Sequence, residues 1–383
     1  FGSRSKNDGA WHNYKTISTF SSTCNEGMST LFTNLGLEAS TNAYGYNGST
    51  MVTNCLFSVK YLISNTTLAT DDLFSFVTAN DGQYVYRNNY TLPIGYAIDH
   101  TLNEKESPSS VYNGIENQNN LIESLTGISN VFELMYNYSS TTEAEFTPTR
   151  NGHIYIYKPE NTTDFLSVTI NGKTYTYSSL KNDNRIIDAG YVTTNDQISM
   201  GAEPASSYKV YILNEDKYMA MYAKLNSSAF NVESFSTTKF TGNISASSDG
   251  TFLFSIPYDK GWSVYIDGKK CQTYEAFGAL LATDLTAGEH TVRLKYVPVN
   301  YIKGCITTIL CIIIIAAGLL KKYRYTAIIN SSKLPPVVID ILNNDDVICK
   351  RTPKKIVTLT ELNDMDDFDN IELDEPESDD DNE

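Results

Sequence analysis

The sequence is poor in the residues and motifs that build most enzyme active sites. Its four histidines form no HExxH motif and show no metal-ligand spacing. No GxSxG nucleophile motif, glycine-rich phosphate loop or dinucleotide fingerprint occurs. The neighbouring acids Asp71 and Asp72, and Glu143 and Glu145, have the chemistry for glycoside cleavage, but such surface pairs are common. We therefore expect no metal and no cofactor, and we assign no catalytic residue.

Cysteine and clustered positive charge are also scarce. The spacing of the six cysteines includes no CxxC, which argues against a zinc or redox site. A Cys24–Cys55 disulfide is an open alternative, but we favour scattered buried thiols. Charged residues make up 19% of the chain, and the first 300 positions contain no basic face for a phosphate backbone. We therefore do not expect nucleic-acid binding. The cysteines are Cys24, Cys55, Cys271, Cys305, Cys311 and Cys349.

The residues that are abundant favour β-structure. Tyrosine occurs 27 times among the 383 residues, and Asn, Ser and Thr crowd the first 300 positions. Tyr and Thr favour pleated strands, whereas Asn, Gly and Ser favour the turns between them. The composition predicts a β-rich domain of extracytoplasmic type. The chain begins "FGSRSKNDGAWHNY" without a Met or an apolar leader, so we expect it to be the C-terminal part of a longer protein.

One apolar run predicts a transmembrane helix over residues 302–320. Residues 304–320 carry no charge, and this length gives about 26 Å of helix, close to the hydrocarbon thickness of a bilayer. A basic cluster with aromatic anchors follows and predicts the cytoplasmic side, so the residues before the run are expected outside the cell membrane. The cluster consists of Lys321, Lys322, Tyr323, Arg324 and Tyr325.

The C-terminal tail, residues 321–383, has a different composition from the rest. Of the formal net charge of −16, about −12 belongs to residues 340–383. Such an acidic stretch cannot bury enough apolar surface to fold, so we expect a largely disordered cytoplasmic tail. The tail either docks a cytoplasmic protein or is simply solvated, and we favour the second alternative.

Two stretches about a hundred residues apart repeat one pattern of strands and turns. The first contains "NGHIYIYKP", "LSVTINGKTY" and "RIIDAGYVTTNDQISM"; the second contains "DGTFLFSIP", "WSVYIDGKK" and "ALLATDLTAGEHTVRLKY". Asn171-Gly172 and Asp267-Gly268 are dipeptides typical of tight type I′ hairpins. We therefore predict two duplicated antiparallel β-sandwiches of jelly-roll character, over residues 146–225 and 226–300.

The region before the repeats, residues 1–145, is predicted to be mixed α+β. Helical patterns occur in "MSTLFTNLGLEAS" and in "IENQNNLIESLTGI", the second beginning near Asn113. The stretches "NCLFSVKYLIS" and "GQYVYRNNYTLPIGYAI" are typical of strands ending in turns. The fold class is therefore mainly β, with an α+β N-terminal region, two sandwiches, one transmembrane helix and the tail.

Aromatic residues at the second hairpin are candidates for carbohydrate contact. Trp262 and Tyr265 flank the strand of "GWSVYIDGKK", and flat aromatic rings stack well on sugar rings. The alternative is that Trp262 packs in the sandwich core, which we favour. Fold alone does not establish sugar binding.

The block "SIPYDKGWSVYIDGKKCQTYEAFGALLATDLTAGEHTVRLKYVPVNYIKG" followed by a span resembles the C-terminal end of YfhO-type bacterial membrane proteins. The stretches "KNDGAWHNYKTISTFSSTCNEGM", "LFTNLGLEAST", "CLFSVKYLIS" and "YTLPIGYAI" resemble earlier parts of the same family, so the similarity extends to about residue 320. The acidic tail departs from the family pattern.

This resemblance implies a multi-pass enzyme similar to C-type glycosyltransferases. Such enzymes take sugar from a polyprenyl-phosphate donor and decorate cell-envelope polymers such as lipoteichoic acid. Their acidic catalytic residue lies in an early loop that is missing from this sequence, so none is transferred. The alternative is a non-enzymatic, membrane-anchored glycan-binding or adhesion ectodomain.

Overall fold

The computed structural model describes residues 5–65, 67, 73–102, 107–159, 165–178 and 186–330, with the side chains of residues 325–330 left aside. Residues Phe1–Lys303 form one compact unit, and Gly304–Glu383 form another. The predicted acidic tail lies outside the described residues, apart from its first ten positions, which belong to a helix.

The N-terminal region contributes short helices and two small antiparallel sheets. The sheets have the orders β1-β3-β2 and β4-β6-β5. The helices are α1 (Asp8–Trp11), α2 (Glu26–Asn34), α3 (Met51–Leu56) and α4 (Gly114–Thr126). The strands are β1 (Thr19–Phe20), β2 (Ala39–Ser40), β3 (Ala43–Tyr44), β4 (Tyr61–Ser64), β5 (Phe74–Asn80), β6 (Gln83–Asn88) and β7 (Gly95–Ile98).

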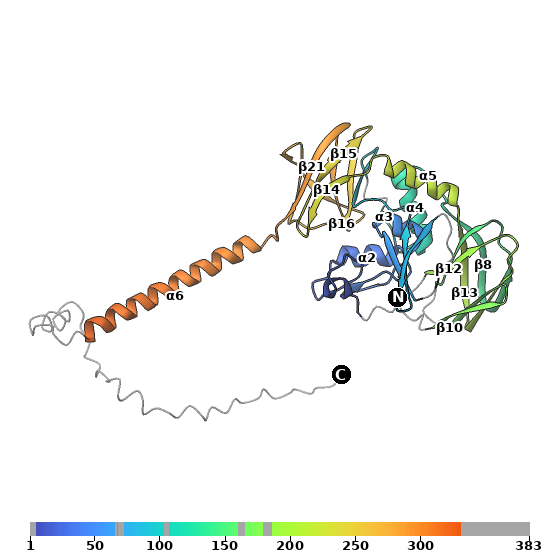
Figure 1. Ribbon diagram of the computed structural model, residues 1–383, viewed down its shortest axis with the longest axis horizontal. Coiled ribbons are helices and arrows are strands. Elements are labelled where there is room, and N and C mark those ends of the chain that lie inside the picture. Colours follow the sequence, from blue (N-terminus) through green and yellow to red (C-terminus); the bar gives the residue numbers. More distant parts are fainter. Residues whose placement is uncertain are drawn as a thin grey trace, which may run out of the picture. The chain divides into compact units, whose positions relative to one another are not determined.

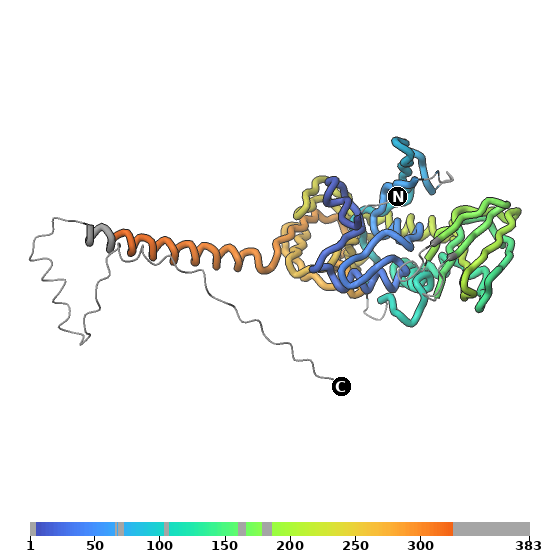
Figure 2. Tube along the Cα trace, turned by 90° about the horizontal axis from the view of Figure 1, so that it is seen from below, coloured from blue at the N-terminus to red at the C-terminus, as the bar shows by residue number. Residues whose placement is uncertain are grey.

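The first β unit is a six-stranded antiparallel sheet that curves around its own core (Figure 2). Its order is β11-β10-β13-β9-β12, and β8 pairs with the other edge of β13. The strands are β8 (Phe132–Phe146), β9 (Gly152–Tyr157), β10 (Phe165–Ile170), β11 (Lys173–Ser178), β12 (Ile186–Val192) and β13 (Ile198–Leu213). The predicted boundary at 145/146 falls at the end of β8, which belongs to this sheet along its whole length.

Helix α5 (Glu215–Asn226) leads into the second β unit, which consists of two sheets. One has the order β14-β15-β21-β17-β18, and the other has the order β19-β20-β16-β7. Buried side chains from both sheets form one core between them. The strands are β14 (Asn231–Ser236), β15 (Lys239–Ala246), β16 (Gly250–Pro257), β17 (Trp262–Ile266), β18 (Lys269–Lys270), β19 (Thr273–Ala276), β20 (Leu280–Leu285) and β21 (Gly288–Tyr296).

The two units repeat one set of strand pairings. β10 pairs with β11 and β13, as β17 pairs with β18 and β21. β9 pairs with β12, as β16 pairs with β20, and β8 flanks β13 as β15 flanks β21. The two predicted hairpins are present, because Asn171-Gly172 and Asp267-Gly268 all have positive φ angles between 50° and 79°. A sandwich has two facing sheets, and this prediction fits the second unit only. In the first unit the long β13 joins all strands into one sheet.

The N-terminal region forms a central core that both units share. Strands β9 and β16 bury residues on both faces, since Ile156 and Phe252 point into their own units while Tyr155 and Leu253 point into the N-terminal core. In Figure 1 the helices α3 and α4 accordingly lie between the two β units. The N-terminal region comes first in the sequence, before the two β units. In the structure it lies between them.

Two predicted strands of the N-terminal region differ in the structure. The first three residues of "NCLFSVKYLIS" belong to helix α3, because Thr50 and Thr53 form a capping box that begins a helix. Only its last residues form strand β4. The stretch over 82–98 forms two strands, β6 and β7, which a segment containing Pro93 separates. Helix α4 occurs where the sequence predicted it, and Asn113 caps it. Helix α2 covers only the first part of "MSTLFTNLGLEAS", because it ends at Asn34 and residues 39–40 form β2.

After the second β unit, helix α6 (Tyr301–Asn330) contains the predicted membrane segment. Residues Tyr301–Arg324 are long and apolar enough to cross a bilayer, with a mean hydropathy of 2.3. None of that stretch is buried against the rest of the protein. A buried core helix would be covered by neighbouring side chains, so the exposure of this helix favours a lipid surrounding.

Candidate functional site

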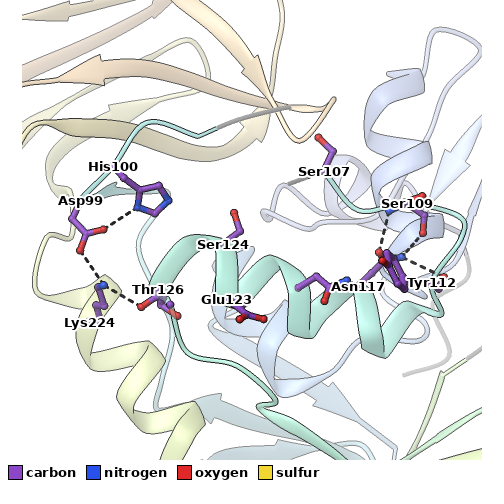
Figure 3. Close-up of a pocket in the computed structure, with 12 residues that line it drawn as sticks. Asp99, His100, Ser107, Ser109, Tyr112, Asn117, Glu123, Ser124, Thr126 and Lys224 are labelled. Carbon is purple, nitrogen blue, oxygen red and sulfur yellow. Dashed lines mark hydrogen bonds and ion pairs between the residues drawn. The ribbon is translucent and has the colours of Figure 1, made fainter. Parts of the chain in front are cut away.

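A polar groove of about 680 Å³ lies along helix α4 (Figure 3). Its walls come from the end of β7, the loop before α4, the exposed face of α4 and the end of α5. Most of the side chains that line it can donate or accept hydrogen bonds. They are Asp99, His100, Ser107, Ser109, Tyr112, Asn117, Asn120, Glu123, Ser124, Thr126, Gly127 and Lys224.

Helix α4 forms the floor because its sequence is amphipathic and capped at both ends. Asn113 accepts hydrogen bonds from the first free N–H groups of the helix, and Glu116 bonds back to the Asn113 N–H. Gly127 ends the helix with a φ of 72°. One face is buried in the central core, which leaves Asn120 and Glu123 exposed in the groove. The buried face includes Ile115, Leu121, Ile122 and Leu125.

One wall is fixed by a buried amide. Asn117 is only 1% exposed. Its Oδ1 accepts from the Ser109 N–H at 3.0 Å, and its Nδ2 donates to the Ser109 carbonyl at 2.8 Å and to the Asn34 carbonyl at 2.7 Å. The loop before α4 is therefore held against the helix. Tyr112, at the end of this loop, keeps half of its ring in solvent, with an exposed fraction of 52%.

The opposite end carries a charged cluster. Asp99 follows strand β7, and its carboxylate lies 2.9 Å from His100 Nδ1 and 2.9 Å from Lys224 Nζ. Lys224 also donates to the Thr126 carbonyl at 3.0 Å, at the negative end of the α4 dipole. The hydrogen bond with His100, followed by the one from Lys224, lowers the pKa of Asp99. A smaller cavity of about 50 Å³ shares Asp99 and Lys224 with the groove.

The groove is suited to binding rather than to acid catalysis. A general acid at neutral pH needs a carboxyl group whose pKa is raised. The pKa of Asp99 is lowered instead, so its carboxylate stays ionised and acts as a hydrogen-bond acceptor. Among the residues that the structure describes, no cluster of His, Cys, Asp and Glu side chains could hold a metal ion. Amides, hydroxyls, one carboxylate pair and one ammonium group together match a hydroxyl-rich ligand.

The two aromatic residues predicted to contact carbohydrate do not form one platform. They lie on strand β17 at positions three apart, so they point to opposite faces of the sheet. Trp262 packs half-buried against the inner core, beside Phe240 and Tyr296. The ring of Tyr265 lies under the guanidinium of Arg293, 4.4 Å from its centroid. The predicted core packing of Trp262 is therefore present in part.

The acid pair Glu143 and Glu145 and the cysteines among the described residues do not line the groove. Glu143 and Glu145 lie on the exposed face of β8, and residues 71–72 lie outside the described residues. Cys24 and Cys55 are both free thiols, and burial raises the pKa of Cys55 to about 12. Cys271, Cys305 and Cys311 are also free, and position 349 lies outside the described residues.

The residues of the groove come from three distant segments, so no local sequence pattern predicts that they meet. Asp99 and His100 stand in "YAIDH" at the end of a strand, Glu123 lies on α4, and Lys224 lies a hundred residues further on. The one available signal was the polar side of "IENQNNLIESLTGI", which an amphipathic helix must present to solvent or to a ligand.

A β-rich domain followed by one long, unburied apolar helix is the architecture of a membrane-anchored protein. The family model described as "Bacterial membrane protein YfhO" matches residues 2–144 and 135–308. The chain belongs to the YfhO family of bacterial membrane proteins, which confirms the resemblance found in the sequence.

Other comparisons add little. No curated protein matches the chain. A cupin 2 conserved barrel domain protein from Leptotrichia buccalis is similar at 12% identity, over 42% of this chain and 80% of that protein, with a TM-score of 0.15. At so low a TM-score, we draw no conclusion from this similarity.

Proposed function

We propose that the chain is the extracytoplasmic domain and the last transmembrane helix of a glycosyltransferase. The enzyme takes sugar from a polyprenyl-phosphate donor and transfers it to a cell-envelope polymer such as lipoteichoic acid. In this proposal residues before α6 lie outside the cytoplasm, and the tail lies inside it. The observation that carries the proposal is the polar groove along α4, on a domain of the YfhO family that a membrane helix anchors.

In this proposal the groove holds the acceptor polymer while catalysis occurs elsewhere in the enzyme. Asn120 and Glu123 are exposed on its floor and can bond sugar or polyol hydroxyls. Lys224 and His100 supply donors for a phosphate in the polymer backbone. The half-exposed ring of Tyr112 offers a stacking face at the other end.

The test measures the sugar content of envelope polymers in the source bacterium. Deletion of the gene should remove one sugar substituent from a polymer, and the intact gene should restore it. Glu123→Gln combined with Asn120→Ala should restore at most a third of the substituent. Glu143→Gln is a matched control, because Glu143 is also exposed but lies on β8, away from the groove. Polymers that are unchanged in the deletion strain would contradict the enzymatic proposal.

The alternative is an anchored glycan-binding or adhesion protein without enzymatic activity. Tyr265 favours this alternative, because its exposed strand face carries the ring and Arg293 together. The coding region upstream of residue 1 separates the two: about ten or more hydrophobic spans favour the enzyme, and a signal peptide alone favours adhesion. A glycan array with the detergent-solubilised chain tests binding by either. Signals that Trp262→Ala and Tyr265→Ala leave unchanged would remove both residues as sugar contacts.

A further inference from the structure

Four aromatic rings line one end of the five-stranded sheet in the second β unit. They come from β14, β15, β17 and β21 and contact one another in series. Phe235 and Phe240 are stacked at 6.4 Å between centroids, Phe240 and Trp262 lie 6.3 Å apart, and Trp262 and Tyr296 lie 5.0 Å apart. We call these four residues the aromatic row.

The register of the sheet places the whole row at the same end. Trp262 pairs with Tyr296, and Lys239 pairs with both Ser236 and Lys295. The hairpin turn at Gly268 lies at the other end, because it follows the last residue of β17. The row thus marks the end of the sheet from which the chain continues into α6.

Chain length keeps this end of the sheet close to the apolar helix. β21 ends at Tyr296 and α6 begins at Tyr301, so four residues join them. At no more than about 3.6 Å per residue, the gap spans less than about 20 Å. Because family membership and the apolar helix place the chain in a bilayer, the aromatic row lies within reach of the lipid headgroups.

The outer end of the row is exposed, whereas Phe240, Trp262 and Tyr296 are half-buried. Phe235 is 61% exposed, and the ammonium group of Lys15 lies 3.4 Å above its ring. The joining segment adds Val299, which is 51% exposed. Large apolar side chains gathered in one exposed area mark an interaction surface. Trp and Tyr in particular favour the boundary between water and hydrocarbon.

Charge at the two ends of this unit differs in sign. Exposed lysines surround the aromatic row, and the exposed acids near it, Glu233 and Asp259, hold hydrogen bonds to Asn243 and to the Gly261 N–H. At the opposite end, four exposed acids outnumber two exposed lysines, Lys269 and Lys270. The lysines around the row are Lys15, Lys239, Lys260 and Lys295; the acids at the opposite end are Asp249, Asp267, Asp284 and Glu289. A basic rim around aromatic rings suits a surface of anionic phospholipid.

We propose that the aromatic row docks on the bilayer that α6 crosses, with its rings at headgroup level and the lysines on anionic lipid. The second β unit then rests on the membrane surface by its own side chains. The polar groove, which belongs to another part of the domain, is thereby held at a fixed height above the lipid.

The chain contains only two tryptophans, which provides a direct test. Trp11→Phe leaves Trp262 as the single reporter in the full chain, reconstituted into vesicles of anionic phospholipid. Lipids brominated near the headgroup should lower its fluorescence at least twofold relative to unbrominated lipid. The matched control places the reporter at the acidic end, by Ala287→Trp in a chain carrying Trp11→Phe and Trp262→Phe. That reporter should be quenched by less than a tenth.

Equal quenching of the two reporters, or none at position 262, would overturn the proposal. If acrylamide also fails to quench Trp262, protein atoms cover the ring, either the sandwich core or another protein surface, and lipid does not. The charge contribution is tested by Lys239→Glu with Lys295→Glu, which should halve the quenching of Trp262, as should raising the salt concentration. Phe235→Ala should do the same without loss of fold, because that ring is mostly exposed.

Discussion

The two β units share their pairings but complete their sheets differently. In the first, β13 extends over 16 residues, and its second half pairs with β9. In the second, β21 ends after nine residues, and β7 from the N-terminal region occupies the place beside β16. The first unit is completed by its own chain, whereas the second borrows a strand from about 150 positions earlier.

Two glycines at corresponding positions support this comparison. Gly152 begins β9, and a Cβ there would lie 2.8 Å from the Leu213 carbonyl at the end of β13. Gly250 begins β16, and a Cβ there would collide with the Ile98 carbonyl at the end of β7. The close contact between the first glycine of a strand and a backbone carbonyl is thus made with β13 in the first unit and with β7 in the second. Strand β7 therefore takes the place in the second unit that the end of β13 has in the first.

The largest expected effect comes from the core of the second unit. Phe252 is completely buried and contacts Phe230 and Phe254. Phe252→Ala should lower the free energy of unfolding by about 4 kcal/mol, through lost burial and a cavity. Hydrogen exchange should rise in β14–β21 and in β7, because β7 completes that sheet. An equal rise in β10–β13 would contradict the separate completion of the two units.

The glycines themselves give the second prediction. Gly250→Ala should displace β7 from β16 and cost about 2–3 kcal/mol. Gly152→Ala should cost a similar amount but affect β9 and β13, where a φ of 152° adds to the close contact. Peptide-level hydrogen exchange distinguishes the two outcomes. Exchange that is unchanged in β7 in the Gly250 variant would show that the strand is not needed to complete the sheet.

The third prediction exchanges the hairpin residues of the units. Asn171 Nδ2 donates to Asp196 at 2.7 Å, whereas Asp267 accepts from the Thr291 N–H at 2.9 Å. Asn171→Asp would bring two carboxylates together and should destabilise the first unit by roughly 1 kcal/mol. Thermal unfolding followed by circular dichroism measures the loss. Asn171→Ser is the control for the lost amide alone, and equal losses in the two variants would exclude charge repulsion.

The smallest effect concerns the pH response of the second hairpin. Asp267 Oδ2 lies 2.7 Å from His290 Nδ1. The hydrogen bond between them lowers the pKa of Asp267 and raises the pKa of His290. The stabilisation from His290 is complete at pH values below 6.5, the ordinary pKa of histidine. It is lost as the pH rises through the raised pKa of His290 in the folded protein. That from Asp267 is complete above 3.8 and is lost as pH falls through the lowered pKa.

The pair therefore contributes most between about pH 4 and 6.5. Titration of the His290 ring by NMR should give a pKa above 6.5, and Asp267→Asn should bring it back toward that value. A titration identical in the two proteins would show that the contact does not persist in solution. At the equivalent turn of the first unit Asn171 donates to Asp196, so the first unit lacks this histidine–aspartate contribution.

Turns and helix caps could be predicted from the sequence, whereas contacts between distant segments could not. Asn171-Gly172, Asp267-Gly268 and the capped helix after Asn113 depend on neighbouring residues, so they could be predicted. The pairing of β7 with β16 and the meeting of Asp99 with Lys224 join segments more than a hundred residues apart. A stretch such as "IGYAID" has the same alternation whether it pairs locally or completes a remote sheet, so composition and period could not reveal its place.

The position of β21 also determines how the domain responds to mechanical load. β21 runs between β15 and β17, antiparallel to both, and its last residue leads within four positions to the membrane helix. Tension transmitted from the bilayer through α6 would act along β21 and load both hydrogen-bond ladders in shear at once. Unzipping one bond at a time, as at an edge strand, would not be available. The tether is thus attached to an internal strand that is paired on both sides, and its forced detachment would be governed by the unfolding rate.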